Sequence, residues 1–250
     1  MIIYLPVYMN SMKININTIG NPKKRALVFF HGWGFDHRVW SSTAALLQDK
    51  YRIFLVDLPG FGHTSLMSWD EFQQMLLEHL PEEFAIAGWS LGGLYATRLA
   101  LESGRVSHLI NIAASPCFVK KEDWPGVNPQ VLEKFLANLE TQPRETLEDF
   151  VVLQARRKSS VLPETLPATT ALRAGLQILE SWDLRKPLAL ANFSIAYCFG
   201  RLDSITPFAV LEAMQAHYPQ FNYHLFKKSA HMPFLSQQEE FIYILEDFIQ

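Results

Sequence analysis

One short stretch of this chain has residue types and a spacing suited to nucleophilic chemistry. Gly88-Trp-Ser-Leu-Gly92 follows a run of apolar residues, and Gly93 comes directly after it. A Gly-x-Ser-x-Gly pattern is typical of a sharp turn from a strand into a helix, which exposes a serine hydroxyl at its apex. Small residues are needed there because the serine backbone is strained and side chains on either side would collide with the turn. We therefore expect Ser90 to be a nucleophile for acyl transfer.

A serine nucleophile needs a base to take its proton and an acid to orient that base. Two later segments contain such residues: Phe199-Gly-Arg-Leu-Asp203 after a buried apolar run, and Lys228-Ser-Ala-His231 after the last expected strand. Each has an ordinary alternative, because Asp203 could be a turn or cap residue and His231 a surface histidine. Both follow strands and occur in the order Ser, Asp, His, so we predict a catalytic triad of Ser90, Asp203 and His231.

Acyl transfer also needs two N–H groups directed at the negative charge that develops on the substrate oxygen. We expect one from Leu91, the residue after the nucleophile. The other should come from Trp33, in the loop His31-Gly-Trp-Gly34 that follows the first buried strand. His31 itself is interpreted as a structural hydrogen-bonding residue. Five further histidines are interpreted as structural residues with no partner apparent in the sequence: His37, His79, His108, His217 and His224.

The elements that must position these groups alternate between strand and helix over most of the chain. Apolar runs typical of strands occur at residues 26–30, 51–56, 83–87, 106–113 and 193–199, with further strands at 13–19 and 222–226. Helical spacing occurs at residues 36–47, 69–80, 91–101, 207–217 and 237–249. This alternation predicts an α/β fold with a mostly parallel, doubly wound sheet.

The alternation stops after Ser115-Pro116. Between residues 118 and 188 only helices are expected, at 129–139, 146–157 and 169–181. An all-helical insertion between two strands would cover the strand ends, where open α/β sheets bind ligands. We therefore divide the chain into an α/β core, residues 1–117 and 189–250, and a helical lid, residues 118–188.

Composition limits the classes of function that fit. The chain has 250 residues, of which 49% are hydrophobic and 19% charged, and a net charge of −3. This describes a globular protein whose overall charge favours neither nucleic acid nor an anionic membrane. The first ten residues lack the basic start of a signal peptide, and no apolar run reaches the roughly 18 residues of a membrane helix.

The two cysteines bear on compartment and metal binding. Cys117 and Cys198 are expected to be free, buried thiols of a cytoplasmic protein. No His/Cys cluster has the spacing of metal ligands, so neither a metal nor a cofactor is expected. We expect a monomer, although the sequence carries no signature of oligomeric state.

With these motifs the chain resembles the α/β-hydrolase superfamily, and more narrowly the pimeloyl-[acyl-carrier-protein] methyl ester carboxylesterases of biotin biosynthesis. The broad resemblance lies in His31–Gly34, Asp57–Gly62, Gly88–Gly93, Asp203 and His231. The narrower one adds Ala114-Ser-Pro-Cys-Phe118, Trp124-Pro-Gly126, Gly175-Leu-Gln-Ile-Leu179 and Asp183-Leu-Arg-Lys-Pro187. It implies hydrolysis of a methyl ester on a pimeloyl chain carried by acyl-carrier protein, without a cofactor. Ser90 would attack the ester, with His231 as base and then acid.

The resemblance also implies sites for the acyl chain and for its carrier. Trp33, Trp89 and Phe150 would line an apolar channel, although each could instead be core packing. Because acyl-carrier protein is acidic, its docking surface on the lid should be basic. The candidate residues are Arg144, Arg156, Arg157, Lys158 and Arg173, and a solvated helix end is the alternative explanation of these cations.

Three other functions fit parts of the same sequence. A general carboxylesterase for short acyl esters would share the triad and the apolar pocket but would need no carrier protein. A C–C bond hydrolase or a cofactor-free haloperoxidase can share the Ser-Asp-His set. A non-catalytic binding module on a hydrolase fold commonly lacks one triad member, and here none is missing.

Overall fold

The computed structural model describes residues 12–155 and 166–250, and these are organised around a seven-stranded sheet. The strands are β1 (Ile16–Gly20), β2 (Ala26–Phe30), β3 (Arg52–Val56), β4 (Phe84–Trp89), β5 (Val106–Ile112), β6 (Ser194–Gly200) and β7 (Asn222–Phe226). They lie in the order β1-β3-β2-β4-β5-β6-β7, and every neighbouring pair is parallel except β1 with β3. The predicted, mostly parallel α/β sheet is confirmed.

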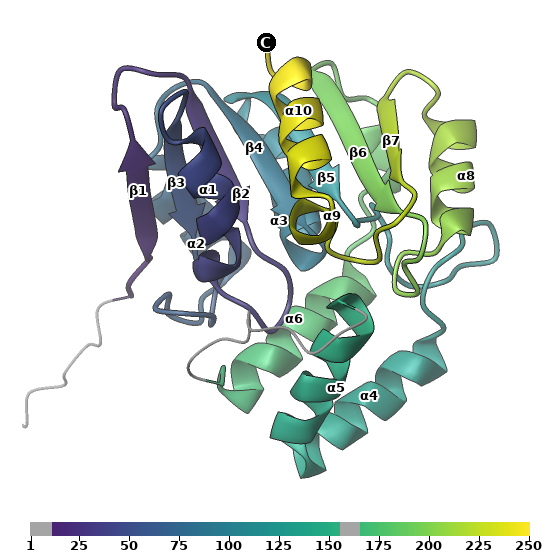
Figure 1. Cartoon of the computed structure of the whole chain (residues 1–250). Helices are drawn as coiled ribbons and strands as arrows, with labels where there is room; N and C mark the ends of the chain where they lie inside the picture. The colour runs from purple at the N-terminus through teal and green to yellow at the C-terminus, as the bar shows by residue number, and fades with distance from the viewer. Residues whose placement is uncertain (1–11, 156–165) are drawn as a thin grey trace, which may run out of the picture.

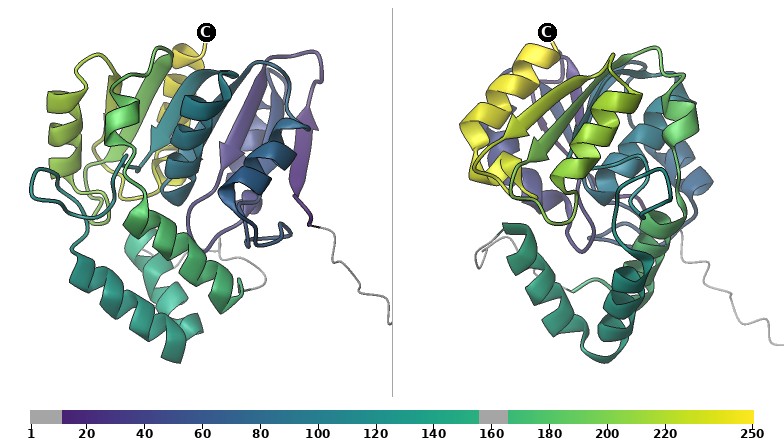
Figure 2. Two further views of the ribbon diagram at one scale, coloured as in Figure 1. Left: turned by 180° about the vertical axis from the view of Figure 1, so that it is seen from behind. Right: turned by 90° about the vertical axis from the view of Figure 1, so that its right-hand side faces the viewer.

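Helices cover both faces of this sheet (Figures 1 and 2). One face packs against α1 (Ser41–Leu47), α9 (Pro233–Ser236) and α10 (Gln238–Phe248), and the other against α2 (Trp69–Leu77), α3 (Leu91–Ser103) and α8 (Phe208–His217). Two hydrophobic clusters result because successive side chains of a strand point to opposite faces. Leu27 and Phe29 belong to one cluster, and Val28 and Phe30 belong to the other.

Local signals in the sequence set several helix ends. Ser68 and Glu71 form a capping box at the start of α2, which satisfies backbone N–H groups that lack a partner within the helix. A short 3-10 helix, η1 (His37–Trp40), precedes α1, and the Asp36 side chain caps it by accepting from the N–H of Arg38. Helix α3 ends at Gly104, whose left-handed conformation (φ of 65°) terminates it.

The insertion between β5 and β6 contains α4 (Pro129–Thr141), α5 (Pro143–Ala155), α6 (Thr169–Ser181) and the four-residue α7 (Arg185–Leu188). Figure 1 shows α4, α5 and α6 grouped together at one end of the sheet. The predicted helical insertion is therefore confirmed, and the residue boundaries of core and lid stay a prediction. Among the described residues, no helix is both long and apolar enough to cross a lipid bilayer.

The insertion differs from the sequence prediction in two details. Helix α5 begins at Pro143, one turn earlier than expected, because proline is well suited to the first position of a helix. The segment before α4 is not helical: isolated bridges join Cys117 to Asp183 and Val119 to Val127. The first of these bridges ties the two ends of the insertion together.

An aromatic cluster fastens the end of α6 to the core. The ring of Trp182, which directly follows α6, lies 5.6 Å from the ring of Trp69 and 5.2 Å from that of Tyr95. The Arg98 guanidinium stands over Trp182 and Trp69, at 4.6 and 5.0 Å from the ring centroids. Aromatic pairs and cation–π contacts of this kind each add to the stability gained from burial.

We expect Trp182→Ala to lower the free energy of unfolding by about 3 kcal/mol, because it removes a large side chain and its contacts with Trp69, Tyr95 and Arg98. Urea denaturation at neutral pH measures this change. Leu190→Ala is the control: Leu190 is 84% exposed, so its truncation should change the value by less than about 0.5 kcal/mol. Equal effects of the two substitutions would contradict the anchoring role of Trp182.

Candidate active site

Ser90 lies in a strained turn between β4 and α3. Its backbone φ is 54° and its ψ is −117°, a conformation that side-chain-bearing residues rarely adopt. The surrounding glycines leave no space for a side chain. A Cβ on Gly88 would lie 2.3 Å from the carbonyl oxygen of Gly92, and one on Gly92 would lie 2.5 Å from that of His31. The structure thus shows the strained, tightly packed turn expected from the sequence. This turn, Gly88–Gly93, is called the elbow.

Asp203 and His231 meet beyond the ends of β6 and β7. The Nδ1–H of His231 donates to Oδ2 of Asp203 at 2.7 Å, and both side chains are buried. This bond assigns the proton to Nδ1 and leaves Nε2 as the basic nitrogen. His231 Nε2 is buried and has no hydrogen-bond partner among the described residues. It is therefore free to accept a proton.

Further hydrogen bonds hold the Asp203 carboxylate. Its Oδ1 accepts from the backbone N–H of Ile205 at 2.8 Å and of Thr206 at 3.1 Å, and the Thr206 hydroxyl donates to Oδ2. Burial alone would raise the pKa of Asp203, but the charge of His231 and these hydrogen bonds outweigh it and hold the pKa below the ordinary value. Asp203 can therefore stay ionised at neutral pH and stabilise a protonated His231.

The loop with the expected oxyanion donor lies beside the elbow. Strands β2 and β4 are neighbours, and the backbone after β2 comes so close to α3 that only glycine fits at position 92. Among the described residues, no hydrogen bond is made by the N–H of Trp33 or of Leu91. Both groups are thus available to an oxygen of a substrate, and their role as the oxyanion hole stays a prediction.

His31 holds this loop in place. Its Nδ1 donates to the carbonyl oxygen of Gly32 at 2.8 Å, and its Nε2 accepts from the backbone N–H of Leu58 at 3.0 Å. Complete burial lowers the pKa of His31, so the imidazole is neutral, as both bonds require. The structural role expected for His31 is confirmed.

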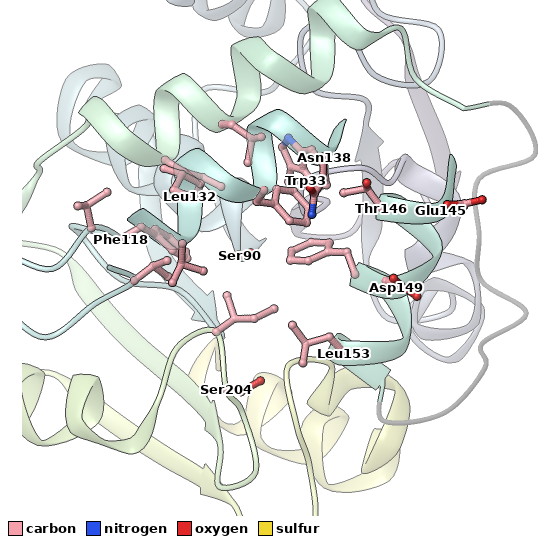
Figure 3. Close-up of a pocket in the computed structure, with 18 of the residues that line it drawn as sticks. Trp33, Ser90, Phe118, Leu132, Asn138, Glu145, Thr146, Asp149, Leu153 and Ser204 are labelled. Carbon is pink, nitrogen blue, oxygen red and sulfur yellow. The ribbon is translucent and has the colours of Figure 1, made fainter. Parts of the chain in front are cut away.

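A cavity of about 500 Å³ lies between the elbow and the lid, and Ser90 forms part of its wall (Figure 3). Trp33 and Phe150 also line it, with their rings edge to face at 5.2 Å. The ring of Phe135 lies 5.3 Å from Trp33 and 5.2 Å from Phe150. Trp33 and Phe150 therefore lie in the wall of the same cavity as Ser90, and their contact with a substrate stays a prediction.

The prediction that Trp89 lines the same channel is wrong. Trp89 is 0% exposed and is absent from the described wall of the cavity. It packs on the opposite side of the sheet, 5.0 Å from Phe35 and 5.2 Å from Phe234 between ring centroids. Its Nε1 donates to the carbonyl oxygen of His231 at 2.8 Å, so the indole supports the backbone that carries the base.

The basic residues expected to bind a carrier protein are only partly described. Arg144 pairs with Glu148 at 3.0 Å along α5, and Arg173 pairs with Glu140 between α6 and α4. Arg156, Arg157 and Lys158 lie outside the described residues. Their assembly into one docking surface stays a prediction.

The sequence prediction missed the partner of His37. Its Nδ1 lies 2.7 Å from Oδ1 of buried Asp57, and its backbone N–H donates to the same oxygen at 2.8 Å. Asp57 also accepts from Asn15 and from the N–H of His63. The two segments meet because they follow the neighbouring strands β2 and β3. This network joins the loop that contains Trp33 to the loop that follows β3.

The same network includes a group of possible metal ligands. Within the described part of the chain, Asp36, His37 and Asp57 are the group whose candidate ligand atoms all lie within 4.8 Å of one another. Those atoms already take part in protein contacts: Asp36 accepts from Arg38, and Asp57 from His37.

The pH dependence of stability tests the His37–Asp57 contact. The hydrogen bond with Asp57 raises the pKa of His37, so folding favours the protonated imidazole. The stabilisation that protonated His37 adds to the free energy of unfolding is full below the unfolded-state pKa of about 6.5. It is lost as the pH rises through the higher pKa of His37 in the folded protein. We expect His37→Gln to lower the free energy of unfolding more at pH 6 than at pH 9, as measured by urea denaturation. His79→Gln is the control, because the exposed His79 ring contacts the carbonyl oxygen of Met75 and bonds to no described carboxylate, so its effect should be alike at both pH values. If His37→Gln lowers the free energy of unfolding equally at both pH values, the stabilising His37–Asp57 contact is contradicted.

The sequence of the chain is similar to those of known proteins along nearly its whole length. Residues 27–242 match the model of the alpha/beta hydrolase family. A pimeloyl-[acyl-carrier protein] methyl ester esterase from Legionella pneumophila (strain Paris) is 46% identical over 95% of this chain and 100% of that protein. The protein of the same name from Serratia marcescens is 39% identical over 93% of this chain and 96% of its own length.

Solved structures resemble the chain along nearly its whole length. An esterase from Exiguobacterium antarcticum has a TM-score of 0.86 at 20% identity, covering 95% of this chain and 96% of that one. A bromoperoxidase from Bacillus anthracis has a TM-score of 0.84 at 22% identity, covering 95% of each chain. At these identities the resemblance shows the fold and no substrate.

Proposed function

The chain belongs to the alpha/beta hydrolase family, and within it we propose that it is a serine esterase that hydrolyses the methyl ester of pimeloyl-acyl-carrier protein. The products are methanol and pimeloyl-acyl-carrier protein with a free carboxylate. The full-length similarity to esterases of that name supports the substrate. The reaction class is supported by one observation above all: a buried His231–Asp203 pair is linked to a strained serine that lines a cavity. The link is Trp89, which directly precedes Ser90 and donates from Nε1 to the carbonyl oxygen of His231.

In the first half of the reaction, Ser90 Oγ attacks the ester carbonyl carbon and its proton moves to His231 Nε2. The negative charge that develops on the carbonyl oxygen is stabilised by the N–H groups of Trp33 and Leu91. Asp203 keeps the imidazole in the required tautomer and stabilises it once it is protonated. The proton then passes from His231 to the departing methoxy oxygen, which leaves as methanol.

The second half repeats this chemistry with water. The acyl group is now an ester of Ser90, and water attacks its carbonyl carbon while His231 accepts the proton. Collapse of the second tetrahedral intermediate returns that proton to Ser90 Oγ and releases a carboxylic acid. This acid then loses the second proton of the water molecule to solvent and becomes the carboxylate product. His231 moves the proton in each attack and each departure at the tetrahedral centre.

The cavity and the cysteines fit this substrate and its compartment. The cavity wall is rich in aromatic and aliphatic side chains, which suits a chain of methylene groups. Cys117 and Cys198 are both free and buried, as the sequence predicted, and free thiols favour the reducing cytoplasm that we propose. Docking of acyl-carrier protein on the lid cations belongs to the same proposal, and the monomeric state stays a prediction.

A general carboxylesterase acting on short free esters is the second candidate. The ion pairs of Arg144 and Arg173 with acidic neighbours favour this second candidate. The neighbouring carboxylates weaken the attraction of these two cations for an acidic carrier protein. Comparison of methyl pimeloyl-acyl-carrier protein with a panel of p-nitrophenyl esters separates the candidates. A preference for the free esters that is unaffected by charge reversal at Arg156 and Arg157 would overturn the carrier-linked substrate.

We expect Ser90→Ala to reduce kcat/KM for methyl pimeloyl-acyl-carrier protein by at least about 10⁴-fold, because the attacking oxygen is removed. Release of methanol measures the rate. Ser204→Ala is the control, since Ser204 lines the same cavity outside the elbow, and it should change kcat/KM only a few-fold. In a biotin auxotroph, the wild-type chain should restore growth and Ser90→Ala should not. Turnover that survives Ser90→Ala would rule out the proposed nucleophile.

A further inference from the structure

One side of the cavity carries two carboxylates. Glu145 and Asp149 lie one helical turn apart on α5 and both line the cavity wall. Figure 3 shows them with Thr146 on one side of Ser90, while Phe118 lies on the other. Both are exposed, and neither side chain makes a hydrogen bond or ion pair with another described residue.

The local structure does not neutralise these charges. Like charges four residues apart on a helix repel each other, and only Glu145, in the first turn, gains from the helix dipole. The adjacent cation, Arg144, pairs with Glu148, and Glu148 does not line the cavity. No lysine, arginine or histidine occurs in the described cavity wall. An anion at this side of the cavity therefore meets two negative charges and no described compensating cation.

Neutral polar groups complete the same wall. Asn138 and Gln142, at the end of α4, line the cavity together with the two carboxylates. Carboxylates accept strong hydrogen bonds from N–H donors, and side-chain amides can both donate and accept. This wall is thus suited to an uncharged group that carries N–H donors and unsuited to a carboxylate.

We propose that Glu145 and Asp149 determine specificity by admitting methyl esters whose distal end is neutral and disfavouring those whose distal end is a carboxylate. The inference rests on the proposed function, since it takes the ester to lie at Ser90 and the rest of the substrate to pass this wall. It predicts that the free half ester of a dicarboxylic acid is a poor substrate. The same acyl chain becomes a good substrate when its far end is capped as an amide.

Two small esters of equal length test this charge selection without a carrier protein. Monomethyl pimelate ends in a carboxylate, and its monoamide ends in an uncharged carboxamide. We expect the wild-type kcat/KM to favour the amide by about 3- to 10-fold, the size expected for screened charges near a protein surface. Glu145→Gln combined with Asp149→Asn should bring the ratio close to one, mainly through faster turnover of the acid. Raising the salt concentration from about 0.05 M to about 0.5 M should narrow the wild-type ratio in the same way.

Glu133→Gln is the matched control, because Glu133 is an exposed carboxylate of α4 outside the described cavity wall. It should leave the ratio at the wild-type value. A double variant that is folded by circular dichroism and keeps the wild-type ratio would overturn the inference, as would an equal change in Glu133→Gln. Turnover of the amide reports separately on the proposed function: if it persists in Ser90→Ala, the esterase assignment fails. If it depends on Ser90 while the ratio ignores both carboxylates, only the charge selection fails.

Discussion

The backbone of Ser90, held at a φ of 54°, is the constraint on which the rest of the site depends. A serine keeps this conformation only where the surrounding structure enforces it. Here the enforcement comes from close backbone packing, because Gly92 approaches the carbonyl oxygen of His31 so nearly that a Cβ would lie 2.5 Å from it. The same contact holds the loop with Trp33 next to Leu91. Strain at Ser90 and placement of the two candidate oxyanion donors thus have a single structural cause.

The parallel sheet brings Asp203 and His231 to the same end of the molecule as Ser90. The loops that carry these residues follow β6, β7 and β4, whose carboxyl-terminal ends lie at the same end of the sheet. Burial of the His231–Asp203 bond keeps water from competing for it and keeps Nε2 free. Trp33 then links the reacting centre to the lid. Its ring packs on Phe150 of α5, and its Nε1 donates to the carbonyl oxygen of Leu172 in α6 at 2.8 Å. A shift of the lid would therefore move the loop that contains the candidate oxyanion donor Trp33. We accordingly expect the lid to affect the rate as well as substrate binding.

Sequence was sufficient where a feature depends on local pattern and chain order. The strands, most helices and the positions of Ser90, Asp203 and His231 follow from such patterns. Features that depend on side-chain direction or on contacts between distant segments could not be predicted. Trp89 directly precedes Ser90, yet the alternation of side chains along β4 turns it to the opposite face of the sheet from the cavity. His37 and Asp57 become neighbours only when β2 pairs with β3. The helices α7 and α9 have four residues each, too few to show a helical period in the sequence. The position of the α5 carboxylates in the cavity wall depends on how the lid helices pack, so it could not be predicted either.

Covalent trapping tests the central claim, that the elbow serine is activated by the buried His231–Asp203 pair. The intact protein is treated with a fluorophosphonate, and the adduct is located by mass spectrometry of its peptides. We expect one adduct per chain, on Ser90, formed far more slowly in a folded His231→Gln variant, because the proton acceptor is then missing. An adduct on another residue would contradict the assignment of Ser90 as the nucleophile. Labelling of Ser90 at an unchanged rate when His231 is replaced would contradict its activation by the pair.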